Sequence, residues 1–125
     1  MLWVNESMLE SLNDMQRDAV THGEGPLLLL AGAGSGKTRV VTTRIVRLLQ
    51  DGAHPSSILA LTFTNRAARE MKERVTKMLA LDQEPPVLIS TFHALGAKLM
   101  RQHAPEFGRS QGFSIYDEDD QVSIL

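Results

Sequence analysis

Cysteine is absent from this 125-residue sequence, which excludes a disulfide framework and any metal site built on thiolates. The four histidines (22, 54, 93 and 103) lack the spacing typical of metal ligands. No apolar run approaches the ~18 residues of a membrane-spanning helix. Residues 1–10 carry acids and no basic stretch, so they are not interpreted as a secretory signal. We therefore expect a soluble intracellular protein without a membrane partner, long enough for one ordinary domain.

Three short apolar runs punctuate the chain at 27–31, 58–63 and 87–90. They contain too few polar positions for strict alternation of apolar and polar residues. Such near-continuous apolar runs are typical of strands buried on both faces of a parallel sheet. Helical patterns lie between and after these runs. The sequence therefore predicts an α/β fold in which helices flank a parallel sheet.

Helices are predicted over 37–50, 65–80 and 92–102. In the first, Gly52 and Pro55 end the helix, Arg44 and Arg47 face outward, and the core positions are Val41, Ile45, Leu48 and Leu49. In the second, the inner stripe is Ala68, Met71, Val75 and Met78. Its outer face carries three oppositely charged pairs at i,i+4 spacing: Arg66–Glu70, Glu70–Arg74 and Glu73–Lys77. A further helix is predicted to start at Asn13, with Asn13 as N-cap and Gln16 at the third helical position.

The strongest motif is "AGAGSGKT" at 31–38, which follows an apolar run and opens a predicted helix. It matches the phosphate-loop pattern G-x-x-x-x-G-K-[ST], except that Ala31 stands in the first glycine position. The glycines let successive backbone N–H groups point at one anion, and the helix adds its positive N-terminal end. Lys37 would reach the β- and γ-phosphates, and the Thr38 hydroxyl would hold Mg²⁺. The alternative, a glycine-rich turn without a ligand, is disfavoured because motif and context agree.

Charge is distributed unevenly around this motif. The stretch 36–77 holds nine Lys/Arg and three Asp/Glu, although the net charge of the whole chain is −2. A basic region beside a phosphate loop suits polyanionic ligands. The same charges could equally form solvated helix faces.

A phosphate loop usually works with an apolar strand that ends in an acid, and the one candidate here is "FSIYDE" at 113–118. Ser114 interrupts the apolar run, whereas a buried parallel strand needs both faces apolar. The favoured interpretation is a turn with Asp117 as the N-cap of a helix. The complete hydrolytic site is therefore not expected within these residues.

Five stretches together resemble the UvrD/PcrA/Rep type of superfamily 1 DNA helicases, in that family's order and at its approximate spacing. They are "LNDMQRDAV" (12–20), "AGAGSGKTR" (31–39), "LTFTNRAAREMKERV" (61–75), "STFHALG" (90–96) and "FSIYDEDDQ" (113–121). Many families share a phosphate loop, but the combination of "TFTNRAAREM" with "STFH" is typical of far fewer families. The resemblance covers nearly the whole chain from Leu12 onward.

The resemblance implies a site for ATP and Mg²⁺, with Lys37 and Thr38 in the catalytic machinery. Gln16 would recognise adenine, although its side chain could instead close a capping box with Asn13. Arg39 would lie near the base or sugar; the alternative is a solvated arginine. The implied nucleotide-binding residues are Gln16, Ala31, Gly32, Ala33, Gly34, Ser35, Gly36, Lys37, Thr38 and Arg39.

The resemblance also implies contacts to single-stranded DNA from two segments: Phe63, Thr64, Asn65 and Arg66, and Thr91, Phe92 and His93. The first segment closes a predicted strand at its carboxyl end, where open α/β sheets bind ligands. Exposed aromatics there can stack on bases. The alternatives are core positions for Phe63 and Phe92, an N-cap for Thr91 and a structural role for His93.

The implied architecture is part of a RecA-like, P-loop NTPase domain at 12–103, preceded by an extension at 1–11. Residues 104–125 would start an inserted helical subdomain. The family's Walker B acids, second RecA-like domain and arginine finger would lie past Leu125. We therefore expect the chain alone to bind Mg²⁺-ATP weakly, with negligible turnover.

The expected function of the full-length protein is that of an ATP-dependent DNA helicase and single-strand translocase, moving 3′ to 5′ by resemblance. Its partners would be single-stranded and duplex DNA and the second RecA-like domain of the same polypeptide, in the cytoplasm and nucleoid of a bacterium. One alternative is another P-loop NTPase, such as a small kinase, although no lid with several arginines is found. The other is a module that binds nucleotide or nucleic acid without turnover.

Overall fold

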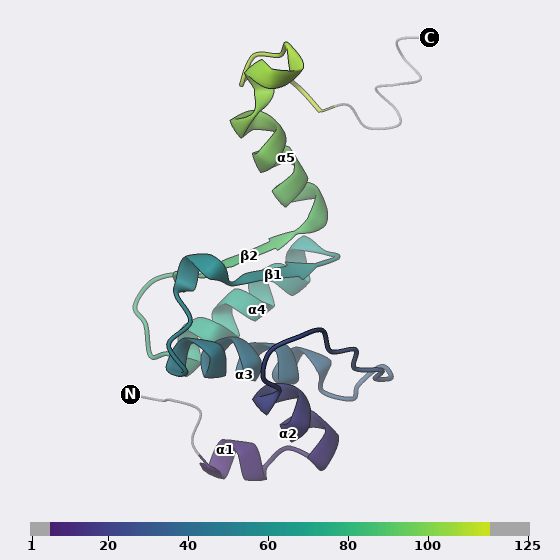
Figure 1. The fold of residues 1–125 in the computed structure, drawn as a ribbon, viewed down its shortest axis with the longest axis vertical. Helices are drawn as coiled ribbons and strands as arrows, with labels where there is room; N and C mark the ends of the chain where they lie inside the picture. The colour runs from purple at the N-terminus through teal and green to yellow at the C-terminus, as the bar shows by residue number, and fades with distance from the viewer. Residues whose placement is uncertain (1–5, 116–125) are drawn as a thin grey trace. The chain divides into compact units, whose positions relative to one another are not determined.

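The computed structural model describes residues 6–115 of the chain (Figure 1). Its α-helices are α1 (Glu6–Glu10), α2 (Asp14–Thr21), α3 (Lys37–Gln50), α4 (Asn65–Met78) and α5 (Phe92–Gln102). Its strands are β1 (Leu59–Thr62) and β2 (Leu88–Thr91), and short 3₁₀ helices are η1 (Pro55–Ser57) and η2 (Ala104–Phe107). The chain divides into two compact units, Met1–Thr91 and Phe92–Leu125, and each is described by itself. The predicted domain boundaries at residues 11 and 103 remain predictions.

The sheet of the first unit consists of β1 and β2, which run parallel with helix α4 as their crossover connection. Leu59 pairs with Leu88 and Thr62 with Thr91, so the two strands begin and end in register. Ala60 and Ile89 on one face are buried, whereas Leu59 and Leu88 on the other are 50% and 37% exposed. The predicted parallel α/β arrangement is therefore confirmed for two strands.

Helix α3 lies between α2 and the two-stranded sheet (Figure 1). On one side Val40 packs with Leu12, Ala19 and Val20. On the other side α3 contributes to the main core, whose buried members are Ile45, Val46, Ile58, Ala60, Ala68, Met71, Val75, Val87 and Ile89. Burial on two sides fixes the position of α3, and with it the position of the loop that precedes it.

The helix boundaries follow capping chemistry. At α2 the Asn13 side chain accepts a hydrogen bond from the backbone N–H of Gln16, so the predicted N-cap is confirmed. The Gln16 side chain accepts a hydrogen bond from the N–H of Asn13, which completes a capping box. At α4 the N-cap is Thr64. The bounds predicted for α3 and α5 are correct, and α4 ends two residues early, at Met78.

The predicted packing of α4 is also confirmed. Ala68, Met71 and Val75 are buried and Met78 packs against them. Of the three predicted charge pairs, Arg66–Glu70 forms at 3.1 Å.

The predicted strand at 27–31 is wrong. Within the described residues the sheet consists of β1 and β2 alone, and this segment belongs to no strand. Its side chains keep a strand-like alternation: Leu29 packs against the cluster beside α2, while Leu28 and Leu30 are 81% and 80% exposed. A parallel strand requires a neighbouring strand, and sequence patterns do not reveal which strands become neighbours.

The prediction of which α3 side chains face the core is partly wrong. Val41, expected in the core, is 41% exposed, whereas Val40 and Val46 are buried. Arg44, expected on the outer face, donates through Nη1 to the carbonyls of Ala19, Val20 and His22, at 3.0, 3.3 and 2.8 Å. These carbonyls lie at the end of α2 and lack helical partners. The packing of α2 against α3 rotates the buried stripe away from Val41.

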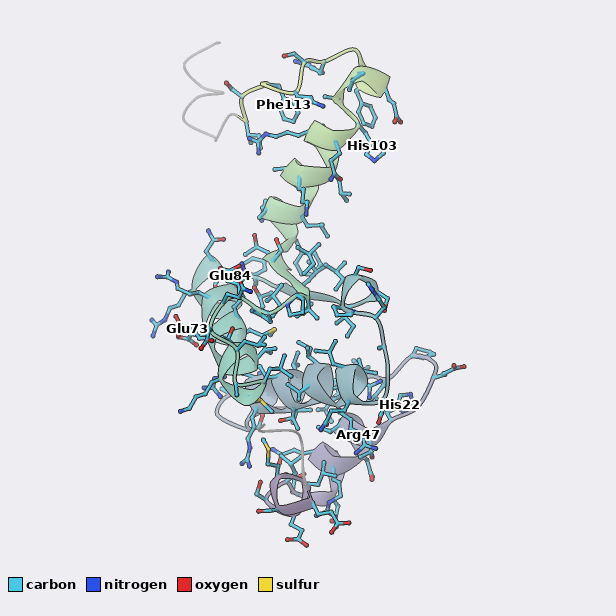
Figure 2. All side chains as sticks on the ribbon, turned by 90° about the vertical axis from the view of Figure 1, so that its left-hand side faces the viewer. His22, Arg47, Glu73, Glu84, His103 and Phe113 are labelled. Carbon is cyan, nitrogen blue, oxygen red and sulfur yellow. The ribbon has the colours of Figure 1, made fainter. Side chains whose placement is uncertain are left out.

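The second unit contains α5, η2 and an irregular segment that reaches residue 115 (Figure 2). The Arg101 guanidinium lies 5.7 Å from the centre of the Phe113 ring, and His103 Nδ1 lies 2.8 Å from a carboxylate oxygen of Glu106. Asp117, predicted as an N-cap, lies outside the described residues, as does the rest of the acidic stretch. In the described part of the chain, every helix is too short or too polar to cross a membrane.

Two valine-to-alanine substitutions in α3 test this assignment of its faces. Val46 is fully buried, so Val46→Ala should lower the free energy of unfolding by about 2 kcal/mol. Val41→Ala, the matched control on the exposed side, should change it by about 0.5 kcal/mol or less. Urea titration followed by circular dichroism measures both. Equal losses would contradict the facing of α3.

Candidate nucleotide and nucleic-acid site

The loop from Ala31 to Gly36 curls between the extended leucines and helix α3. Gly34 and Gly36 have φ values of 73° and 81°, in the left-handed region that glycine adopts without strain. The Ser35 backbone N–H and hydroxyl both donate to the Gly32 carbonyl, at 3.3 and 2.5 Å. These bonds close a turn within the loop and occupy one of its carbonyl groups.

Helix α3 presents unpaired backbone donors to this loop. Its first helical hydrogen bond runs from the Val40 N–H to the Gly36 carbonyl, at 3.1 Å. The N–H groups of the preceding residues therefore have no acceptor within the helix, and they carry the positive end of its dipole. Such a terminus suits an anion.

Lys37 and Thr38 occupy the first turn of α3. The Lys37 ammonium donates to the Ala31 carbonyl at 3.3 Å, so this side chain folds back across the loop. Thr38 is half-buried, and its carbonyl accepts a hydrogen bond from the Thr42 hydroxyl at 2.9 Å. One cationic group and one hydroxyl thus lie next to the free N–H groups.

Gln16 contacts the same loop from helix α2. Its Nε2 donates to the Ser35 carbonyl at 2.9 Å, while its Oε1 accepts from the Asn13 N–H at 3.0 Å. The capping box, weighed as an alternative to adenine recognition, is therefore formed. The same side chain reaches the loop as well, which sequence reasoning did not anticipate.

Arg39 is exposed but hydrogen-bonded, since its Nη2 donates to the Ser11 hydroxyl. That hydroxyl donates in turn to the Met8 carbonyl at 2.6 Å, in helix α1. The guanidinium therefore lies against the junction of α1 and α2. A freely solvated arginine, the alternative considered for this position, is not observed.

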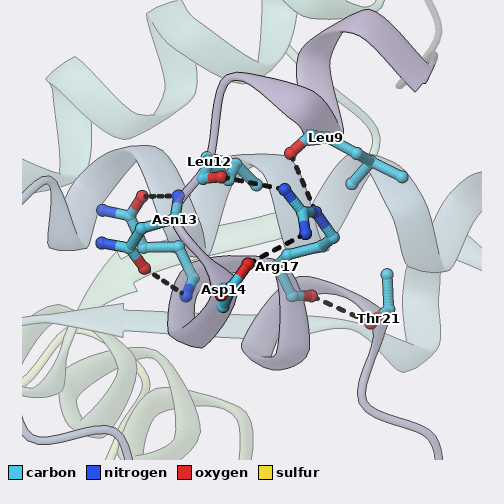
Figure 3. Close-up of polar contacts among 7 residues, drawn as sticks. Leu9, Leu12, Asn13, Asp14, Arg17 and Thr21 are labelled. Atoms are coloured by element: carbon cyan, nitrogen blue, oxygen red, sulfur yellow. Dashed lines mark hydrogen bonds and ion pairs between the residues drawn. The ribbon is translucent and has the colours of Figure 1, made fainter.

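The start of α2 is held by Arg17 (Figure 3). Its Nε donates to the Leu9 carbonyl and its Nη2 to the Leu12 carbonyl, both at 3.2 Å, and its Nη1 pairs with Asp14 at 3.2 Å. Arg17 and Arg44 together hold both ends of α2, the helix that carries Gln16. The sequence pattern did not predict these roles, because both arginines donate mainly to backbone carbonyls, which every residue carries; the Asp14–Arg17 pair alone has a helical i,i+3 spacing.

A second group of predicted residues lies where β1 ends. Phe63 is 83% exposed, so its alternative assignment to the core is wrong. Thr64 caps α4 by accepting from the Ala67 N–H at 3.1 Å. Asn65 and Arg66 are exposed in the first turn of α4, and Arg66 pairs with Glu70. An aromatic ring, an amide and a guanidinium therefore meet solvent at this edge of the sheet.

The third predicted group spans the end of β2 and the start of α5. Thr91 is 5% exposed, and it is the register partner of Thr62. Phe92 is 60% exposed, so the expectation that it belongs to the core is wrong. Within the described residues α5 has no buried side chain, so Phe92 does not belong to a buried face of its own helix. His93 is exposed.

Similarity to known proteins is extensive. The chain is 46% identical over 121 residues to the ATP-dependent DNA helicase PcrA of Leuconostoc citreum, 96% of this chain and 16% of that protein. It is 48% identical over 120 residues to PcrA of Staphylococcus aureus (strain NCTC 8325 / PS 47), a match that covers 95% of this chain and 16% of that protein. It is 46% identical over 126 residues to PcrA of Bacillus subtilis (strain 168), a match that covers 100% of this chain and 17% of that protein.

The chain thus spans about one sixth of the length of the curated relatives it matches. Residues 12–125 match the family model described as the UvrD/REP helicase N-terminal domain. The matched range includes the loop at 31–36 and the edge residues after β1 and β2. The chain therefore belongs to the UvrD/REP helicase N-terminal domain family.

Proposed function

We propose that this chain supplies the nucleotide-binding part of an ATP-dependent DNA helicase that translocates on single strands. Its family, and the name that its relatives share, support this activity. The observation that carries it is the loop at 31–36: its glycines curl the backbone at the N-terminus of a 14-residue helix, and Lys37 reaches across it. We propose accordingly that the fold is part of a RecA-like, P-loop domain.

The residues present fit a magnesium-bound nucleoside triphosphate. The backbone N–H groups from Gly32 to Thr38, apart from that of Ser35, would hold phosphate oxygens. The Ser35 N–H donates to the Gly32 carbonyl, and the other N–H groups of this stretch remain available. The Lys37 contact to Ala31 is long and exposed, so the ammonium can exchange a carbonyl for a phosphate. Thr38 would supply a hydroxyl to Mg²⁺.

The base and sugar would lie toward α2. Gln16 would bind adenine through its carboxamide, and Arg39 would lie beside the base or sugar. When bound, ATP supplies the free energy of phosphoanhydride cleavage. The chain's own residues bind and orient it, and a second RecA-like domain of the same polypeptide would complete the site.

Single-stranded DNA would contact the carboxyl ends of the strands. Phe63 offers an exposed ring for base stacking, while Thr64, Asn65 and Arg66 offer polar groups for the backbone. Thr91, Phe92 and His93 would form a further contact segment. Duplex DNA would be the substrate of unwinding, in the nucleoid of a bacterial cell.

Lys37→Ala should abolish or greatly weaken binding of Mg²⁺-ATP, by about tenfold or more, because it removes a side-chain cation that crosses the loop. Lys77→Ala, at an exposed position on α4, is the matched control and should bind as the unmodified chain does. Isothermal titration calorimetry measures both affinities. Unchanged binding by Lys37→Ala would show that the loop is not the nucleotide site.

Phe63→Ala should weaken binding of a single-stranded oligonucleotide by about tenfold, the effect of losing one stacked base. Phe107→Ala removes another ring that is 62% exposed, and it should leave affinity unchanged. Fluorescence anisotropy with a labelled oligonucleotide at low salt measures both. If Phe63→Ala bound as tightly as the unmodified chain, the proposed stacking contact would be refuted.

A further inference from the structure

The peptide unit between Ser35 and Gly36 is held from outside the loop. Gln16, 19 residues earlier in the chain, donates from Nε2 to the Ser35 carbonyl at 2.9 Å. Its contact with the loop is close, since a Cβ placed on Gly36 would lie 3.2 Å from the same nitrogen. Gly36 thus leaves room for the carboxamide as well as adopting a positive φ.

The orientation of the Gln16 carboxamide follows from its two partners. The Asn13 N–H can only donate and the Ser35 carbonyl can only accept, so Oε1 must face Asn13 and Nε2 must face the loop. The capping box therefore does more than start helix α2: it aims the amide donor at the loop.

The hydrogen bond to the Ser35 carbonyl also fixes the direction of the Gly36 N–H. In a trans peptide the C=O and the next N–H point in opposite directions, so a fixed Ser35 carbonyl sets the direction of the Gly36 N–H. Rotation of this peptide changes ψ of Ser35 and φ of Gly36, and glycine tolerates either sign of φ, so little steric hindrance from the Gly36 side opposes the rotation. A rotated peptide would turn an electronegative oxygen toward the place where phosphate would bind.

We propose that Gln16 is a positioning residue for the phosphate loop: its Nε2–H holds the Ser35–Gly36 peptide with the N–H aimed at phosphate. This role rests on the proposed function, in which the loop binds a nucleotide, and differs from recognition of the base. The two roles are compatible, because the carboxamide retains one N–H and one oxygen lone pair that could pair with adenine. Loop geometry and base recognition would then act through one side chain.

A ligand without a base separates the two roles. Magnesium tripolyphosphate presents the phosphates alone, so a residue that only reads adenine leaves its affinity unchanged. Gln16→Met, which lacks the amide, should weaken tripolyphosphate binding by about fivefold, the effect of one exposed hydrogen bond. Asn13→Ala removes the Asn13 side chain from the cap but keeps the Gln16 donor, and it should bind within about twofold of the unmodified chain. Calorimetry with tripolyphosphate and with Mg²⁺-ATP measures all three proteins.

Two calorimetric outcomes would overturn the proposal. A loss of affinity for ATP alone in Gln16→Met would assign Gln16 to the base only. Equal losses of tripolyphosphate affinity in Gln16→Met and Asn13→Ala would assign the effect to the helix cap.

Backbone ¹⁵N relaxation of the ligand-free chain, measured by NMR, supplies a readout that needs no ligand. The order parameter of the Gly36 N–H should be lower in Gln16→Met than in the unmodified chain or in Asn13→Ala, and equal order parameters would overturn the proposal. If the unmodified chain bound neither ligand, the proposed nucleotide site would fail, and this relaxation measurement would still decide whether Gln16 holds the peptide.

Discussion

Burial of helix α3 on two sides is the constraint on which the first unit depends. Val40 packs toward α2, while Ile45 and Val46 pack into the core beneath the sheet. Because both sides are occupied, the first turn of α3 has a fixed position relative to α2 and β1. That position brings Lys37 over the loop and the Ser35 carbonyl within reach of Gln16. The candidate site is therefore a consequence of how one helix is packed.

The sequence predicts well whatever depends on neighbours along the chain. The bounds of α3 and α5, the N-cap at Asn13 and the inner stripe of α4 all rest on interactions within a few residues, and all are confirmed. The loop motif at 31–36 was also evident, because its glycines and Lys37 are contiguous. Its ligand remains a proposal, supported by the family match.

The errors concern interactions between distant residues. A strand at 27–31 was predicted from its leucines, but strand formation depends on a partner whose identity no local pattern encodes. Val41 was assigned to the core because the position of α2 against α3 could not be foreseen. For the same reason the carbonyl contacts of Gln16 and Arg44 were missed: backbone oxygens are present in every residue and leave no signal in the sequence.

The exposed leucines at 27, 28 and 30 give the first unit a surface through which binding can raise its stability. Each such side chain gains about 1.5–3 kcal/mol when it is fully buried. A molecule that covers them in the folded chain, and that does not bind the unfolded chain, stabilises the fold by an amount that grows with the logarithm of the concentration of that molecule. A melting temperature of this chain is therefore complete only with the concentration of such a molecule beside it.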